Sequence, residues 1–257
     1  MRWTRLLAPL FALAATLAAQ PTAPKTLAIV AAASMRPALD EAKAAYEKAH
    51  PGIRLQISYG ASGSLTAQIQ QGAPVDVFLS ADLAFPEKLA QGGLATADGV
   101  VPYAKGLLVL WVRKDTGADP AKLGLKALTD PAIKRIAIAN PKLAPYGLAA
   151  ETALQKAGLH ETVLPKIVQA ENINQAAQYL VTGATEAGFI ALSLMDNATL
   201  KETGWTWLVP KDLYAPIIQG AVVLKRTQLP VEAKQYLDYL VGAEGFKLLQ
   251  RYGFEKP

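Results

Sequence analysis

The sequence predicts an α/β fold of mostly parallel sheets flanked by helices. Short apolar strand patterns alternate with helical patterns along the chain, and Gly or Pro separates most of them. Hydrophobic residues make up 51% of the 257 positions, and charged residues only 18%. Alternation of strands and helices favours parallel pairing, because each helix carries the chain back across the sheet. This length and composition allow one large or two modest domains.

Changes of hydrophobic period define the first elements. The apolar run over residues 27–30 predicts a strand, and apolar residues three or four apart predict a helix over 35–49 that ends before Pro51. The alternating residues 53–58 predict a strand with one buried face. Next come a small-residue loop, a helix over 65–71, a strand over 75–79 and a short helix up to Gly92.

The apolar run over residues 107–112 predicts a strand buried on both faces. We expect the chain to cross there into a second lobe and to return through the apolar run over 217–224. Further strands are predicted over 136–139, 167–170, 188–191 and 205–209, with helices over 148–157 and 173–182 and two more after Pro230. The crossings divide the chain into lobe I, residues 25–105 and 216–257, and lobe II, residues 106–215.

The amino terminus differs from the rest of the chain. Arg2 and Arg5 precede an apolar run over residues 6–17, and small residues follow it. A bilayer takes about 20 residues, so the run is too short to span one and is typical of a secretory signal. We expect a signal peptide over residues 1–19 and a secreted protein. A lipid anchor would need a Cys, which the sequence lacks.

Composition excludes several classes of function. The absence of Cys excludes disulfides, thiol nucleophiles and thiolate metal sites. The two histidines, His50 and His160, lie in predicted connections, where we expect them at the surface. Without the two arginines of the signal, 24 basic and 21 acidic residues leave a net charge of +3. That charge is too mild to indicate a nucleic-acid partner.

Four junctions between a strand and a helix stand out, at Ser34, Ser62, Tyr146 and Ile173. Ligands of open α/β sheets bind beyond the carboxyl ends of strands, where helix starts direct their N–H groups at one point. These junctions carry hydroxyl and N–H donors without Lys or Arg, which indicates an anion held by neutral dipoles. The alternative is that each junction is ordinary, with a Ser or Asn capping its helix and the Tyr packed beside a Pro.

The same donors would discriminate among anions. An oxyanion that keeps a proton needs an acceptor for its O–H, and a site made only of donors leaves that group unpaired. Phosphate should therefore bind less well than fully ionised molybdate, tungstate or sulfate. Glu171 is the one nearby acid that could supply an acceptor, and we expect it to point away from the junctions.

Several runs of residues resemble a known family. They are residues 31–34, 60–65, 71–82, 140–147 and 251–254, with the patterns Gly-Ala-Pro-x-Asp-x-Phe-x-Ser-Ala-Asp and Asn-Pro-x-x-Ala-Pro-x-Gly among them. In these runs, and over nearly its whole mature length, the chain resembles the periplasmic molybdate-binding proteins of ABC importers. That family has a two-lobed, type II solute-binding fold.

The resemblance implies a binding protein, not an enzyme, with no cofactor. It implies that molybdate, and tungstate as well, is bound in the cleft between lobes without a direct protein ligand to the metal. Ser34 and Ser62 would supply hydroxyl and backbone donors, and Tyr146 and Ile173 backbone N–H groups. The lobes would close on a hinge near residues 103–107 and 212–216 and present a surface to a membrane permease. We expect a monomer.

One position departs from a branch of that family. Ala191 stands where the branch has a Tyr hydroxyl donor, and the loop around Tyr146 is similar to a second branch that lacks this donor. Asn172 and Asn174 are the polar side chains nearby that could replace it, and the sequence does not choose between them.

Other functions stay open. A receptor for sulfate or another tetrahedral oxyanion would use the same donors, since cavity size decides among dianions. A secreted serine hydrolase with Ser34 or Ser62 as nucleophile would need a base, and the two histidines lie in predicted loops away from the junctions. A purely structural partner protein would bind no small ligand.

Overall fold

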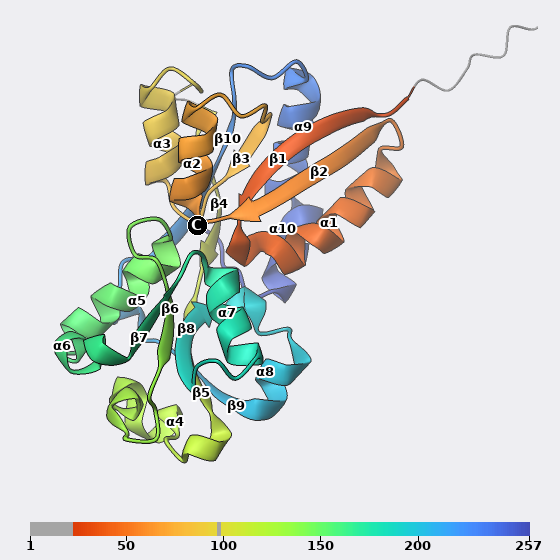
Figure 1. The fold of residues 1–257 in the computed structure, drawn as a ribbon. Coiled ribbons are helices and arrows are strands. Elements are labelled where there is room, and N and C mark those ends of the chain that lie inside the picture. The colour runs from red at the N-terminus through yellow and green to blue at the C-terminus, as the bar shows by residue number, and fades with distance from the viewer. Residues whose placement is uncertain (1–22, 97–98) are drawn as a thin grey trace, which may run out of the picture.

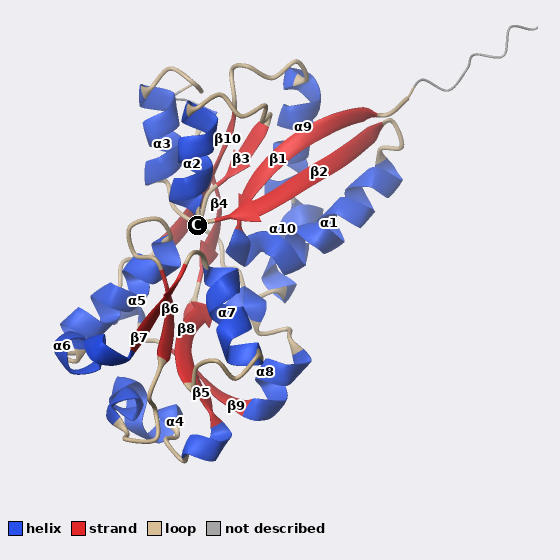
Figure 2. Cartoon of the chain, viewed as in Figure 1, coloured by secondary structure: helices blue, strands red, loops and turns tan. Residues whose placement is uncertain are grey.

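The computed structural model describes residues 23–96 and 99–257, and the predicted signal peptide lies outside them. The chain forms two halves, each a five-stranded sheet flanked by helices, with strands passing between them (Figures 1 and 2). None of the described helices is both long and apolar enough to cross a membrane. The α/β fold with two sheets is as predicted.

The first half contains β1 (Lys25–Ala32), β2 (Ile53–Gly60), β3 (Val77–Leu79), β4 (Val101–Gly106) and β10 (Ile217–Val223), in the sheet order β2-β1-β3-β10-β4. Its helices are α1 (Arg36–Ala49), α2 (Ser62–Gln70), α3 (Ala84–Gln91), α9 (Pro230–Val241) and α10 (Ala243–Arg251). A 3-10 turn, η1 (Ala33–Met35), precedes α1, so this helix begins one residue later than predicted.

The second half contains β5 (Leu108–Arg113), β6 (Ile136–Ala139), β7 (Ile167–Ala170), β8 (Ala187–Ala191) and β9 (Gly204–Leu208), in the order β7-β6-β8-β5-β9. Its helices are α4 (Pro120–Leu123), α5 (Pro145–Lys156), α6 (His160–Val163), α7 (Ile173–Val181) and α8 (Ala198–Thr203). A 3-10 turn, η6 (Leu192–Leu194), follows β8.

The prediction of mostly parallel sheets is wrong in one respect, because both sheets are mixed. Strand β1 runs parallel to β2 and β3, and β6 runs parallel to β7 and β8. Strand β10 is antiparallel to β3 and β4, and β5 is antiparallel to β8 and β9. The strands β5 and β10 begin where the chain passes between halves, so no crossover helix within one sheet requires them to be parallel.

Each half has its own core. In the second half, Trp111 of β5 is fully buried, and its indole N–H donates to the carbonyl of Leu200 at 2.8 Å. Gly204 makes room for this ring, because a Cβ there would lie 1.9 Å from it. In the first half, Tyr46 and Tyr236 meet edge to face with their ring centroids 5.2 Å apart. Trp111 thus joins β5 to α8, and the tyrosine pair packs α1 against α9.

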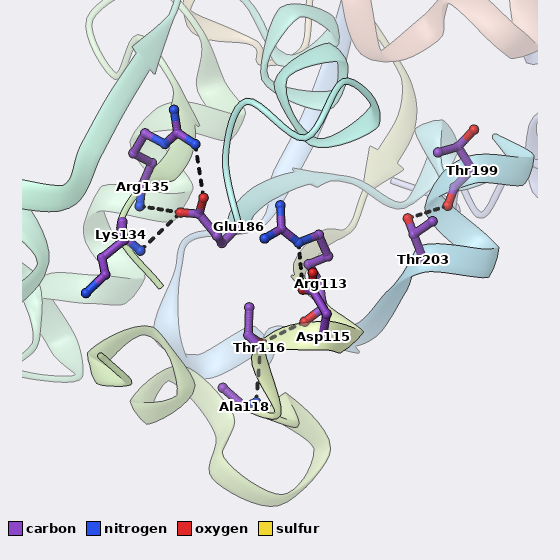
Figure 3. A network of polar contacts seen from close by, with 9 residues as sticks. All are labelled: Arg113, Asp115, Thr116, Ala118, Lys134, Arg135, Glu186, Thr199 and Thr203. Atoms are coloured by element: carbon purple, nitrogen blue, oxygen red, sulfur yellow. Dashed lines mark hydrogen bonds and ion pairs between the residues drawn. The ribbon is translucent and has the colours of Figure 1, made fainter. Parts of the chain in front are cut away.

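A carboxylate ties strands of the second sheet together at the end where β8 starts (Figure 3). Glu186 precedes β8 and accepts from the backbone N–H groups of Lys134 and Arg135 at 3.0 and 2.8 Å and from the Arg135 side chain at 3.1 Å. Its own carbonyl accepts from Arg113 N–H at 2.9 Å, at the end of β5. The Glu186 carboxylate thus ties the start of β8 to the residues before β6, and its backbone carbonyl ties the same point to the end of β5.

Candidate functional site

The four junction residues of the sequence line one cavity between the halves. Ser34, Ser62, Tyr146 and Ile173 surround a cavity of about 10 Å³, and each is between 0 and 4% exposed. The other lining residues are Ala32, Ala33, Gly60, Ala61, Ala81, Ala144, Pro145 and Asn172. Cavities for drug-sized ligands measure about 300–1,000 Å³, whereas about 10–15 Å³ holds one water molecule. The walls of this cavity therefore lie close together and leave room only for a very small solute.

Strand pairing explains why the junctions converge. In the first half, Ala32 of β1 pairs with Gly60 of β2, so Ser34 and Ser62 both lie two residues beyond the same rung of the sheet. In the second half, Ala139 of β6 pairs with Ala170 of β7, and the chains leaving these strands lead to Tyr146 and Ile173. The two parallel strand pairs therefore point their carboxyl ends at the junction between the halves (Figure 1).

Ser34 supplies a buried hydroxyl that lacks a partner. Its Oγ has no hydrogen bond to any described residue, and the side chain is fully buried. An unpaired buried polar group costs about 1–3 kcal/mol. The serine does not cap its helix either, since no side-chain cap is present at η1. The hydroxyl is thus a donor in the cavity wall that lies near the Tyr146 hydroxyl but makes no well-formed hydrogen bond to the described residues.

Ser62 supplies a second hydroxyl, which the protein orients. Its Oγ accepts from the backbone N–H of Ala81 at 3.0 Å. A hydroxyl has one proton to donate in addition to its acceptor positions, so this bond leaves the proton free for another group. Ser62 is the first residue of α2 and not its cap, which is Ala61. The capping alternative is therefore wrong for both serines.

The helix starts of the second half add backbone donors. Helix α5 opens with Pro145, which has no N–H, so Tyr146 carries its first N–H group, and no side chain caps the helix. At α7, Asn172 is a true cap, as its Oδ1 accepts from the N–H groups of Asn174 and Gln175 at 3.0 and 3.1 Å. The Asn172 side chain does not cap the N–H of Ile173. That N–H also has no carbonyl partner within α7, since the first N–H groups of a helix lack one.

The electrostatics of the cavity favour an anion. Every lining residue is uncharged, and three helices of nine, nine and twelve residues, α2, α7 and α5, begin at it. Each start carries a partial positive charge. Glu171 is exposed and does not line the cavity, as expected. In the described part of the chain no three His, Cys, Asp or Glu side chains are grouped to hold a metal ion.

The structure also bears on which polar side chain could replace the Tyr hydroxyl donor that Ala191 lacks. Ala191 is fully buried and is not among the lining residues. Asn174 lines a different cavity, whereas Asn172 does line this one but uses its side-chain oxygen as a helix cap. Of the two, only Asn172 lines this cavity.

Hydrogen bonds across the cavity hold the halves together. The N–H of Gly63, next to Ser62, donates to the carbonyl of Leu143 at 2.8 Å. On another side, the Ser193 hydroxyl of η6 donates to the carbonyl of Ser34 at 2.7 Å. These bonds could not be predicted from the sequence. The same holds for Ala33, Gly60 and Ala81 as residues that line the cavity. The small side chains at the strand ends were the available signal, since they let backbone approach a ligand.

The cavity offers no base for a serine nucleophile. His50 is exposed, and its ring stacks on Tyr46 with centroids 4.1 Å apart. His160 lies beside Glu151 and Glu161, away from the cavity lining. Hydrolysis by Ser34 or Ser62 would need a base within hydrogen-bonding reach, so this geometry favours binding over catalysis.

Comparisons with known proteins show the family and the fold of the chain. The family model described as bacterial extracellular solute-binding protein matches residues 27–255. The molybdate-binding protein ModA of Rhodobacter capsulatus is 41% identical over 244 residues, which cover 95% of this chain and 93% of that protein. The solved periplasmic molybdate-binding protein of Azotobacter vinelandii superposes with a TM-score of 0.82 at 35% identity, covering 90% of this chain and 99% of that one. A sulfate-binding protein of Mycobacterium tuberculosis, 16% identical with a TM-score of 0.72, shares the fold alone.

Proposed function

The chain belongs to the bacterial extracellular solute-binding protein family, and from this premise we propose that it is the molybdate-binding component of an ABC importer, with tungstate as a second ligand. The observation that carries the proposal is one buried, uncharged cavity lined by Ser34, Ser62, Tyr146 and Ile173. The relatives named for molybdate binding, at 41% and 39% identity, support the choice of ligand.

We propose that the oxyanion is held by donors alone. Ser34 and Ser62 give their hydroxyl protons and backbone N–H groups, and Tyr146 and Ile173 give backbone N–H groups. Burying an anion costs several kcal/mol of hydration, and each hydrogen bond to a charged group returns about 1.5–3 kcal/mol. Five to seven such bonds, on the order of those available here, are enough for roughly micromolar binding or tighter.

The absence of carboxylates among the lining residues supports selectivity for fully ionised oxyanions. The uncharged lining offers no carboxylate to a protonated oxyanion, so phosphate loses a hydrogen bond on binding. Sulfate is also a dianion and would not be rejected on this ground. It is therefore the alternative ligand, and the size of the closed cavity decides between it and molybdate.

We propose that lobe I, residues 25–105 and 216–257, and lobe II, residues 106–215, open and close around the ligand. The chain passes between them at the end of β4 and at the start of β10, close to the predicted hinge at 103–107 and 212–216. Closure would form a continuous surface for a membrane permease. Secretion through a signal peptide over residues 1–19 would deliver a monomeric receptor to the periplasm.

A thermal-shift series with molybdate, tungstate, sulfate, phosphate and perchlorate tests the proposal. A ligand at 100 times its dissociation constant stabilises the fold by about 2.7 kcal/mol, so molybdate and tungstate should raise the melting temperature and phosphate should not. A flat response to both molybdate and tungstate would overturn the proposal. A response to sulfate alone would assign the alternative ligand.

A pair of variants locates the binding. Ser62→Ala removes a hydroxyl from the cavity wall and should weaken molybdate binding about tenfold or more. Ser64→Ala is the matched control, because Ser64 lies on the same helix but outside the cavity lining. Equal effects of the two substitutions, measured by calorimetric titration, would place the ligand elsewhere.

A further inference from the structure

A buried hydrogen-bonded chain connects the two walls of the cavity through the strand by which the chain returns to the first half. Its centre is Gln219 of β10, which is fully buried. The Gln219 amide oxygen accepts from the Tyr103 hydroxyl at 2.7 Å, and its amide nitrogen donates to the Tyr146 hydroxyl at 3.2 Å. Each polar atom of this side chain thus has a partner, one in each half.

Both ends of the chain reach residues that line the cavity. On the first-half side, the Tyr103 hydroxyl also lies 3.0 Å from the carbonyl of Ser80, and the next residue, Ala81, orients Ser62 through its N–H. On the second-half side, the partner is Tyr146, which lines the cavity and carries the first N–H group of α5. Movement of one half relative to the other would therefore break or form the hydrogen bond between Gln219 and Tyr146.

The backbone is built to admit this contact. A Cβ on Gly106, the last residue of β4, would lie 1.9 Å from the Tyr146 hydroxyl and 2.9 Å from the Gln219 amide nitrogen. The pairing of β10 with β4 also shifts register between Gln219 and Gly220, and such irregularities redirect side chains beside binding sites. Burial raises the pKa of Tyr146 above its ordinary value, so its hydroxyl stays protonated at neutral pH.

We propose that Gln219 is a positioning residue for oxyanion binding. It holds Tyr146 of the second half against Tyr103 and Ser80 of the first half and so keeps the closed cavity from opening. The inference rests on the proposed function, since it concerns the release of the same ligand. Gln219 does not touch the ligand. Its effect falls on dissociation, because the bond exists only while the halves are together.

The test compares molybdate dissociation rates, followed by stopped-flow fluorescence, in the full mature chain. Gln219→Met keeps the length of the side chain without its donors and acceptors, and Tyr146→Phe removes the same bond from the other side. We expect each to speed dissociation about tenfold, as for the loss of one hydrogen bond, with the association rate within about twofold of the original. The double variant should dissociate no faster than the single ones, because both remove one shared bond.

Tyr236→Phe is the matched control. Tyr236 is a fully buried tyrosine whose hydroxyl has no hydrogen bond to any described residue, so its loss should leave the dissociation rate unchanged. Unchanged rates in Gln219→Met and Tyr146→Phe, or additive effects in the double variant, would overturn the inference. If Gln219→Met does not fold, Tyr146→Phe alone decides it. Failure of the unmodified protein to bind molybdate would instead refute the proposed function.

Discussion

The hydroxyl of Ser193 donates to the carbonyl oxygen of Ser34 at 2.7 Å, although 159 positions separate the two residues. A residue just after β8 of the second half thereby holds the peptide that carries a candidate ligand donor of the first half. Because both residues are buried, water does not replace this bond while the halves are closed.

Ser193→Ala should weaken molybdate binding about fivefold. The substitution removes a bond of about 1 kcal/mol that forms only in the closed state, and it leaves the Ser34 carbonyl unpaired there. Calorimetric titration measures the change. Ser58→Ala on the exposed face of β2 serves as control and should bind as the unmodified protein does. An affinity unchanged in Ser193→Ala would mean that this bond does not contribute to closure.

Ser34→Ala should leave the free protein as stable as before or slightly more stable, but it should weaken ligand binding. The hydroxyl is buried without a partner, so its removal should leave the melting temperature of the free protein unchanged or slightly higher. With ligand, the loss of a hydrogen bond to an anion, worth about 1.5–3 kcal/mol, should weaken binding by a factor of about 10–150. Thermal shift with and without molybdate separates the two effects.

A fall in the stability of free Ser34→Ala with unchanged affinity would contradict this prediction, since it would give the hydroxyl a partner within the protein. Thr66→Val is a useful contrast, because the Thr66 hydroxyl is also buried but donates to the carbonyl of Ser62 at 2.8 Å. That variant should lose stability in the free state.

The local parts of this structure were accessible from sequence. The strands at 136–139 and 167–170 have the predicted bounds, because each is a short apolar run between polar or turn residues. Strand β4 was missed, since Pro102 and Lys105 interrupt its pattern. Such a pattern is tolerated because β4 is an edge strand, where a missing backbone donor costs no sheet bond.

The residues of the site also differ in whether the sequence alone could indicate them. Ser34 and Ser62 could be found because a strand ends and a helix begins beside each. Gln219 and Ser193 could not, since their partners lie 73 and 159 positions away and nothing in their own segments indicates a contact. Contacts between halves depend on how the two sheets are joined, which local periodicity does not encode.

Gly147→Ala should destabilise the protein by about 3 kcal/mol. A Cβ at Gly147 would lie 2.2 Å from the carbonyl oxygen of Ala139, and a backbone atom at the end of β6 cannot move aside easily. Urea unfolding followed by circular dichroism measures the loss. Gly52→Ala is the control, as a Cβ there meets no atom within 4 Å, and its stability should stay within about 0.5 kcal/mol of the original.

Stability at acidic pH should depend on Glu186. Burial raises the pKa of its carboxyl, but the hydrogen bonds from the Arg135 side chain and from the backbone N–H groups of Arg135 and Lys134 outweigh this effect and hold the pKa below its ordinary value. A carboxyl with a lowered pKa in the folded state stabilises the protein above its unfolded pKa of about 4.5, and this contribution is lost as the pH falls through the folded value.

Glu186→Gln should therefore cost about 2 kcal/mol at pH 7 and lose less stability than the original chain when the pH is lowered from 6 to 3. Urea unfolding at both pH values measures the difference, with exposed Glu202→Gln as control. A pH dependence identical in Glu186→Gln and the original chain would exclude this carboxylate as the source.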